Sequence, residues 1–184
     1  MRIITGKAKG LNLKSPKGFK TRPTADRIKE SIFNVLSNLI EFENLNVFDM
    51  FAGTGALGLE ALSRGSKFCT FVDNETSSII KDNVNRAHFQ DFSEIIGGDV
   101  FKFLNHTNKI YDLIFCDPPY NIGLWQSALK KIDEKNILSI NGYMIVEHGI
   151  DENFFEQLFN LEFLRKLEYG KTTAIEIFKR KELI

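Results

Sequence analysis

The sequence is poor in the residues that would cross-link a chain or anchor it in a membrane. Its two cysteines, Cys69 and Cys116, lie in apolar stretches without the spacing of metal ligands. Two such thiols indicate buried, reduced side chains in a reducing compartment, so we expect a cytoplasmic protein without a disulfide framework. No apolar run approaches the roughly 20 residues of a membrane span, and the residues after Met1 show no signal-peptide pattern. We therefore expect no membrane association.

Histidine is also scarce, and the composition excludes several classes of protein. His88, His106 and His148 show no ligand spacing, so we predict no metal site. The chain has 184 residues, of which 43% are hydrophobic and 26% charged. These values are typical of a single globular domain and argue against a disordered, collagen-like or coiled-coil chain.

Acidic residues are absent from the first 22 positions, although the whole chain has a formal net charge of zero. Residues 1–22 hold seven of the 24 basic residues, which leaves 17 basic against 24 acidic residues, a net charge of −7, in residues 23–184. A basic segment beside an acidic body indicates a polyanionic partner. Short apolar stretches around Gly6 and Gly10 predict that this segment is a hairpin arm rather than a tail. We therefore divide the chain into an arm, 1–22, and a domain, 23–184.

The domain alternates between strand and helix patterns, which predicts a parallel α/β sheet with helices on both faces. A closing hairpin would add one antiparallel strand. The predicted helices are residues 24–39, 55–63, 75–88 and 100–104, a helical stretch after 122 and a helix from about 152. The predicted strands are residues 46–51, 67–73, 94–97, 111–116, 143–146, 161–169 and 172–178.

A glycine-rich loop follows the first predicted strand and opens a helix. In Gly53-x-Gly55-x-x-Gly58, the glycines allow a ligand to approach the backbone, and the helix N-terminus offers free N–H groups. Asp73 ends the next strand, where a carboxylate can accept hydrogen bonds from a ribose. This pattern alone fits either a dinucleotide or S-adenosylmethionine. Asp49 favours the second, because an acid at the loop would repel a pyrophosphate but suits a cationic ligand.

Further residues at the same edge of the sheet complete the predicted cofactor site. Phe51 lies in the loop itself, and Asn74 follows Asp73. Asp99 and Val100 follow the third domain strand, where the acid could meet an adenine amino group. We predict that these four residues contact the cofactor together with Asp49, Gly53, Gly55 and Asp73.

The strongest chemical signal is Asp117-Pro118-Pro119-Tyr120, directly after the buried strand 111–116. Two prolines remove two N–H donors and fix an extended turn, so the loop presents the Asp117 carboxylate and the Pro118 carbonyl as acceptors. Two acceptors can hold both hydrogens of an exocyclic amine and direct its lone pair at a methyl group. Tyr120 can stack on the base. We therefore predict these four residues to be catalytic.

Together these motifs resemble a known family. The glycine loop with Asp117–Tyr120 is similar to Rossmann-like, class I S-adenosylmethionine-dependent amino-methyltransferases. The N-terminal segment and the stretch from Thr21 to Asn34, which reads TRPTADRIKESIFN, narrow the resemblance. They are similar to the small bacterial 16S ribosomal RNA guanine-N2 methyltransferases, named for methylating guanine 966. The resemblance covers nearly the whole chain, including Tyr169–Thr172.

This resemblance implies a mostly parallel seven-stranded sheet with an antiparallel C-terminal strand and an N-terminal basic hairpin. It implies methyl transfer from S-adenosylmethionine to a guanine N2 amine during small-subunit assembly, by a monomer without metal. The residues expected to meet 16S rRNA are basic side chains and one threonine near the arm: Arg2, Lys7, Lys9, Lys14, Arg22 and Thr24. The family pattern is variable after the strand at 143–146, so we assign no role to Glu147 and His148.

Two other functions stay open at this point. An adenine-N6 DNA methyltransferase shares the Asp117–Tyr120 chemistry, although 184 residues leave little room for a separate recognition domain. A nucleotide-dependent oxidoreductase would use the glycine loop but gives no reason for Asp49. The loop chemistry does not separate guanine from adenine, so that choice rests on the resemblance.

Overall fold

The computed structural model describes residues 1–16, 23–120 and 122–182 and contains one seven-stranded sheet. The strand order is β3-β2-β1-β4-β5-β7-β6. The strands are β1 (Asn46–Met50), β2 (Phe68–Asp73), β3 (Ser93–Gly97), β4 (Tyr111–Cys116), β5 (Leu138–Gly149), β6 (Leu161–Tyr169) and β7 (Thr173–Arg180). The α-helices are α1 (Pro23–Leu36), α2 (Ala56–Ser63), α3 (Ser77–Ala87), α4 (Val100–His106) and α5 (Leu124–Lys135), with a short 3-10 helix η1 (Gln90–Phe92).

Strands β1 to β5 pair in parallel, whereas β7 runs antiparallel to both β5 and β6. The predicted fold, a mostly parallel sheet with one reversed C-terminal strand, is confirmed. The strand order reverses between β1 and β4, and a parallel sheet forms its ligand crevice at such a point, outside the carboxyl ends of the strands. Both predicted motifs follow these two strands, so the topology brings them to one place.

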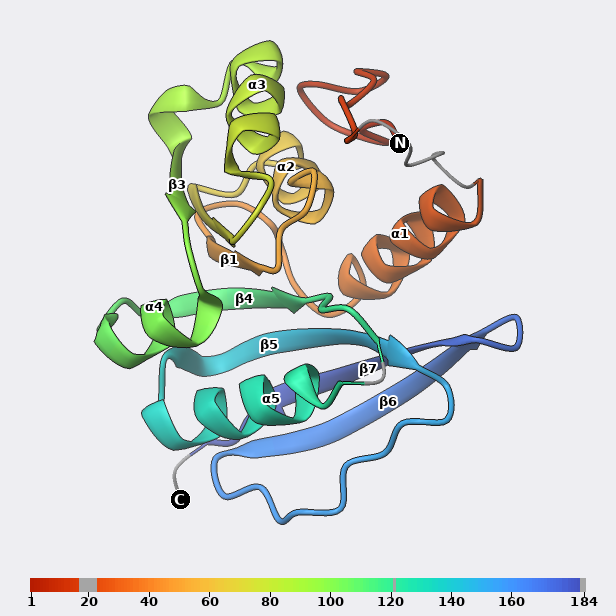
Figure 1. Ribbon diagram of the computed structural model, residues 1–184, viewed down its shortest axis with the longest axis vertical. Helices are drawn as coiled ribbons and strands as arrows, with labels where there is room; N and C mark the ends of the chain where they lie inside the picture. The colour runs from red at the N-terminus through yellow and green to blue at the C-terminus, as the bar shows by residue number, and fades with distance from the viewer. Residues whose placement is uncertain (17–22, 121, 183–184) are drawn as a thin grey trace.

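The helices cover both faces of the sheet, as Figure 1 shows. On one face α1, α2 and α3 bury a large apolar cluster, which includes Ile32, Leu59 and Ile80. On the other face α4 and α5 bury a second cluster around Leu104 and Trp125. The sheet is therefore the middle of three layers, which explains why its central strands read as continuous apolar runs. Among the described residues, no helix has the length and apolar character to cross a membrane.

The N-terminal segment folds back on itself as an irregular hairpin and packs against α2 and α3. Arg2 and Asn12 form an isolated antiparallel bridge, and the N–H of Ile3 donates to the carbonyl of Leu11 at 3.0 Å. Ile3 and Leu13 are buried in the same core as α1, α2 and α3. The hairpin is thus an integral part of this layer, while the division into arm and domain stays a prediction.

A buried carboxylate on α2 holds this segment in place. Glu60 is 0% exposed, and its two oxygens accept the backbone N–H groups of Ile4 at 2.7 Å and Thr5 at 3.0 Å. The same carboxylate pairs with Lys29 of α1 at 3.4 Å and with Arg64 at 3.0 Å. Glu60 therefore ties the N-terminal segment, α1 and α2 together through one charged group.

The connection between β5 and β6 contradicts the sequence prediction of a helix from about residue 152. The segment is irregular instead. Asp133 at the end of α5 accepts the N–H groups of Phe159, Asn160 and Leu161 at 2.7–2.9 Å. The N–H groups at the end of the connection therefore bond a side chain of another element instead of helix carbonyls.

Candidate active site

A cavity of about 690 Å³ opens at the carboxyl ends of β1, β4 and β5, and both predicted motifs contribute to it. Its walls come from five parts of the chain. They are Met1; Ile28, Lys29 and Ile32 of α1; Asp49 and the loop and helix positions 51–54, 56 and 57; Asp117 and Tyr120; and Glu147 with Thr172 and Thr173. The cavity therefore unites segments that lie far apart in the sequence.

Asp49 is a buried carboxyl group at the base of this cavity. Its side chain is 2% exposed, and its Oδ2 accepts the Gly58 N–H at 2.9 Å. Burial raises the pKa of Asp49 to about 8, against the partial relief of that hydrogen bond and with the added repulsion of Asp73. Among the described residues, no basic side chain pairs with it. A cationic ligand would supply the missing counter-charge.

The glycine loop between β1 and α2 has a left-handed backbone. Phe51, Gly53 and Gly55 all have positive φ, of 55°, 55° and 77°. The left-handed conformation is strained for Phe51, which has a Cβ atom, and not for the glycines. Gly55 is the N-cap of α2, so the loop presents the N-terminus of that helix at the cavity edge.

Asp73 holds the glycine loop from the end of β2. Its Oδ2 accepts the Gly53 N–H at 2.9 Å, and its Oδ1 accepts the N–H groups of Glu75 and Thr76 at 2.8 Å. Burial opposes its ionisation, but the donors of Thr76, Glu75 and Gly53 outweigh this cost and lower the pKa of Asp73. Asp73 is therefore a charged anchor of the loop beside the cavity.

Asp117, Tyr120 and Glu147 form the opposite wall. The Tyr120 hydroxyl donates to Glu147 Oε1 at 2.6 Å and lies 3.4 Å from Thr173 Oγ1. Burial among protein atoms, with the neighbouring Glu147 and Asp49 carboxyls, raises the pKa of Asp117, although its side chain remains open to solvent through the cavity. Burial likewise raises the pKa of Glu147. The wall is thus rich in oxygen atoms that can accept hydrogen bonds from a bound donor.

The other predicted site residues lie around the cavity rather than in its lining. Gly55 ends the glycine loop as the N-cap of α2, and Asp73 bonds the loop from the end of β2. Asn74 and Asp99 are exposed, and the Asp99 carboxylate caps α4 by accepting the Lys102 N–H at 2.7 Å. The Val100 side chain is buried in the core under α4 and α5. Pro118 is buried, whereas Pro119 is exposed. Their contacts with a cofactor or substrate stay predictions.

The predicted RNA-contacting residues are exposed where the structure describes them. Arg2, Lys7, Lys9 and Lys14 all face solvent, and Lys14 pairs with Asp82 of α3 at 2.7 Å. Arg22 and the side chain of Thr24 lie outside the described part of the chain, although Thr24 itself belongs to the first turn of α1. Over the described residues, no group of three or more His, Cys, Asp or Glu side chains is arranged as a metal site.

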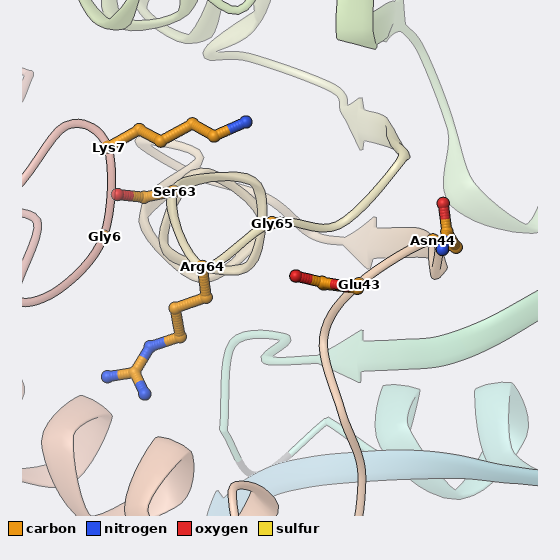
Figure 2. A pocket seen from close by; sticks show the side chains of 7 residues that line it. All are labelled: Gly6, Lys7, Glu43, Asn44, Ser63, Arg64 and Gly65. Atoms are coloured by element: carbon orange, nitrogen blue, oxygen red, sulfur yellow. The ribbon is translucent and has the colours of Figure 1, made fainter.

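A second hollow, of about 570 Å³, lies at the opposite edge of the sheet, between the N-terminal segment, the end of α2 and the loop before β1. Figure 2 shows the Lys7 side chain along this hollow and Arg64 turned away toward α1. Arg64 is engaged there, because its guanidinium pairs with Glu60 and lies 4.7 Å from the Phe33 ring centre. This hollow shares no lining residue with the cavity of the two motifs, so we place the candidate active site in the larger cavity.

Most lining residues were not predicted from the sequence as parts of the site, and Met1, Lys29 and Glu147 are three of them. Lys29 is 3% exposed and donates to the Arg2 carbonyl at 2.6 Å, and burial lowers its pKa despite the nearby Glu60. Of these three residues, only Glu147 could have been predicted from the sequence. An acid near the end of a buried parallel strand lies at the edge of the sheet where ligands bind.

Comparisons with known proteins match nearly the whole chain. The sequence profile of a family described as Conserved hypothetical protein 95 matches residues 1–178. The chain belongs to this family. One relative, named "Putative rRNA methyltransferase YlbH", from Bacillus subtilis, is 36% identical over 98% of this chain and 100% of its own length. Ribosomal RNA small subunit methyltransferase D of Escherichia coli is 30% identical over 82% of this chain and 76% of its own.

The comparison with solved structures gives the same result as the comparison of sequences. A structure titled "Putative methyltransferase yhhF from Escherichia coli" matches with a TM-score of 0.85 and 26% identity, over 100% of this chain and 99% of the other. The predicted family and the Rossmann-like methyltransferase fold are therefore confirmed.

Proposed function

We propose that this chain transfers a methyl group from S-adenosylmethionine to the exocyclic N2 amine of a guanine in 16S ribosomal RNA, of the guanine 966 type. The observation that carries the proposal is the single cavity that joins the glycine loop at Asp49 to the acceptor loop at Asp117. The family membership supports an RNA substrate, because several relatives are named for small-subunit rRNA methylation.

The cofactor end of the cavity fits a cation. S-adenosylmethionine carries a sulfonium whose methyl group is activated for transfer to an amine. The buried Asp49 carboxyl, which has no basic partner among the described residues, would balance positive charge there. We assign Phe51, Gly53 and Gly55 to the methionine part and Asp73, Asn74, Asp99 and Val100 to the nucleoside. A pyrophosphate would meet the carboxyl groups of Asp49, Asp117 and Glu147, which argues against the dinucleotide oxidoreductase.

The other end of the cavity would hold the target amine. The Asp117 carboxylate and the Pro118 carbonyl would accept its two hydrogens and direct its lone pair at the methyl group. Tyr120 would stack on the base, with its hydroxyl fixed by Glu147. Asp117 or Glu147 would retain a proton lost from the amine until solvent removes it.

The remaining parts of the proposal concern the setting of the reaction. Arg2, Lys7, Lys9 and Lys14, which are exposed, and Arg22 and Thr24 would meet RNA phosphates. We propose a cytoplasmic monomer that acts on the assembling small subunit. A compact enzyme of this kind reaches a base that is already unpaired or flipped out of its stack.

Two measurements test the proposal. Calorimetry is expected to show binding of S-adenosylmethionine or its demethylated product and no binding of NADH. Undermethylated small subunits, incubated with enzyme and labelled cofactor and digested to nucleosides, are expected to give N2-methylguanosine. Label in N6-methyladenosine, or in DNA but not RNA, would overturn the assignment of the base.

The role of Asp117 is tested by Asp117→Ala in the same assay. We expect single-turnover methylation to fall by at least about 100-fold, because the amine loses its charged acceptor, while cofactor affinity stays within a few-fold. Methylation at the wild-type rate would refute this role.

A further inference from the structure

Glu147 stands next to Asp117 across the sheet. Cys116 of β4 is the register partner of Val146 of β5, so Asp117, which directly follows β4, and Glu147 of β5 are the next residues along these neighbouring strands. Adjacent strands lie about 4.8 Å apart, and register partners point to the same face. Both side chains line the same cavity. The cavity therefore has two carboxyl groups side by side, one strand spacing apart.

Glu147 is only half engaged by the protein. Its Oε1 accepts the Tyr120 hydroxyl at 2.6 Å, and within the described parts of the chain no donor contacts its Oε2. A carboxylate oxygen can accept hydrogen bonds and cannot donate them. Glu147 thus offers the cavity one free acceptor beside those of the Asp117 loop.

We propose that Glu147 accepts a hydrogen bond from the N1–H of the target guanine and thereby makes the cavity select guanine over adenine and cytosine. This inference rests on the function proposed above. In guanine the exocyclic amine is flanked by a ring N–H, so the base presents adjacent donors to adjacent acceptors. In adenine and cytosine, a ring nitrogen with a lone pair flanks the amine and would face the Glu147 carboxylate.

The rest of the cavity strengthens this discrimination. Ile28 and Ile32 of α1 give the lining an apolar side. In a partly dry site, a carboxylate that faces another acceptor loses its water without gaining a partner, which is the costly way to bury a polar group. The chemistry of the pair, rather than the size of the cavity, would therefore decide which base reacts.

The test compares guanine with 2-aminopurine, which keeps the 2-amine but has a lone pair at N1. Small subunits are reconstituted with ligated 16S rRNA that carries either base at the target, and single-turnover methylation is measured. Glu147→Gln keeps an acceptor for Tyr120 and adds an amide N–H that can donate to N1 of 2-aminopurine. We expect the preference for guanine over 2-aminopurine to fall about 10- to 100-fold in this variant. 2-Aminopurine also lacks the O6 of guanine. This difference affects wild type and variant alike, so it cancels when the base preference of the variant is divided by that of the wild type.

Tyr120→Phe is the matched control, because it removes the other partner of Glu147 and leaves the carboxylate in place. We expect both rates to fall in this variant while the ratio between the two bases stays at the wild-type value. An unchanged ratio in Glu147→Gln means that Glu147 only positions Tyr120, and it overturns the inference.

If Glu147→Gln is inactive on both RNAs, the same ratio is measured as their affinities in the presence of S-adenosylhomocysteine, whose own binding reports the fold. A binding ratio equal to that of the wild type again overturns the inference. A wild-type enzyme that methylates adenine overturns the proposed function as well, whereas a guanine product with an unchanged ratio in the variant refutes the role of Glu147 alone.

Discussion

At the scale of single residues, the cavity is lined by three carboxyl groups that have few partners in the protein. Asp49, Asp117 and Glu147 all have raised pKa values, in each case chiefly through burial. A fold that buries acids without basic partners loses stability for the sake of a site. A neutral substitution of such an acid is therefore expected to raise the stability of the fold and to lower the activity of the site.

Asp49→Asn makes this separation measurable. Between pH 3.8 and about pH 8, the folded chain keeps the Asp49 proton that the unfolded chain has released, so this residue makes the free energy of unfolding fall as pH rises. The amide keeps an oxygen for the Gly58 N–H and does not titrate. At pH 8 we expect the variant to be more stable than wild type by at least about 1.4 kcal/mol, the equivalent of one pKa unit.

Denaturant unfolding at pH 4 and pH 8 checks this expectation, with the exposed Asp91→Asn as control. The stability gain of Asp49→Asn should be absent at pH 4, and affinity for S-adenosylmethionine should fall. An equal gain at both pH values would show that titration of Asp49 is not its cause.

Gly58 gives a second prediction at this scale. A Cβ at this position would lie 2.4 Å from the Phe71 ring and 2.5 Å from Cys69 Sγ, because α2 packs closely on β2. Gly58→Ala is expected to lower the free energy of unfolding by about 1–3 kcal/mol, despite the better helix propensity of alanine. Gly98→Ala, where no atom lies within 4 Å of the added carbon, should change it by less than about 0.5 kcal/mol. Thermal or denaturant unfolding measures the stability of both variants, and an equal loss in the two would contradict the packing argument.

The sequence predicts some of these acids and not others for a geometric reason. Asp117 directly follows a continuous apolar strand, so its place at the sheet edge can be predicted, and Asp49 precedes the glycine loop. Glu147 lies inside β5, which continues to Gly149, well beyond the apolar run that defines it in the sequence. The direction of its side chain depends on pairing with β4 and β7, and no local pattern contains that information.

At the scale of elements, the N-terminal segment depends on one charged group from another element. Glu60 of α2 accepts two backbone N–H groups of this segment and pairs with the buried Lys29. Such a group is costly to neutralise, because its removal leaves a buried cation without a partner.

Glu60→Gln is therefore expected to lower the free energy of unfolding by about 3–5 kcal/mol and to release the segment first. Amide hydrogen exchange at Ile4 and Thr5 should become faster than in the helices. As control, Asp82→Asn breaks the exposed pair with Lys14 and should cost less than about 1 kcal/mol. Protection of Ile4 and Thr5 at the wild-type level in Glu60→Gln would show that apolar packing alone holds the segment.

The missing helix between β5 and β6 shows where element prediction fails. The segment carries helix-forming residues, yet Phe155 and Phe159 are 92% and 74% exposed in the irregular connection. The backbone N–H groups at its end, from Phe159 to Leu161, bond Asp133, which lies 26 to 28 residues earlier in the chain. By contrast, β4 forms over the predicted residues because a buried parallel strand is marked by its own apolar run. A local sequence pattern cannot show that a carboxylate far away in the chain will accept the backbone N–H groups that a helix would use.

At the scale of the whole molecule, the basic N-terminal segment and the acidic body are packed together rather than held apart. Lys14 already pairs with Asp82, whereas no acid pairs with Lys7 or Lys9 among the described residues. The predicted RNA-binding lysines are therefore not equivalent in the free protein.

The salt dependence of RNA binding tests this difference. For Lys7→Ala/Lys9→Ala, the slope of log affinity against log salt should flatten by up to roughly 0.7–0.9 per lost phosphate contact. Lys14→Ala should change the slope less, because RNA must compete with Asp82 for this lysine. Lys109→Ala, which breaks the exposed pair with Glu94, is the control. A larger effect of Lys14→Ala than of the double variant would contradict this ranking.

The place of β7 in the sheet has a consequence for the order in which a growing polypeptide can fold. β7 lies between β5 and β6, and among the described strands β6 pairs with β7 alone. During synthesis, residues 161–169 leave the ribosome before their pairing partner exists, and the edge of β5 stays open in the meantime. β7 closes the sheet, so nascent chains that stop before residue 173 leave the edge of β5 and both edges of residues 161–169 unpaired, which invites aggregation.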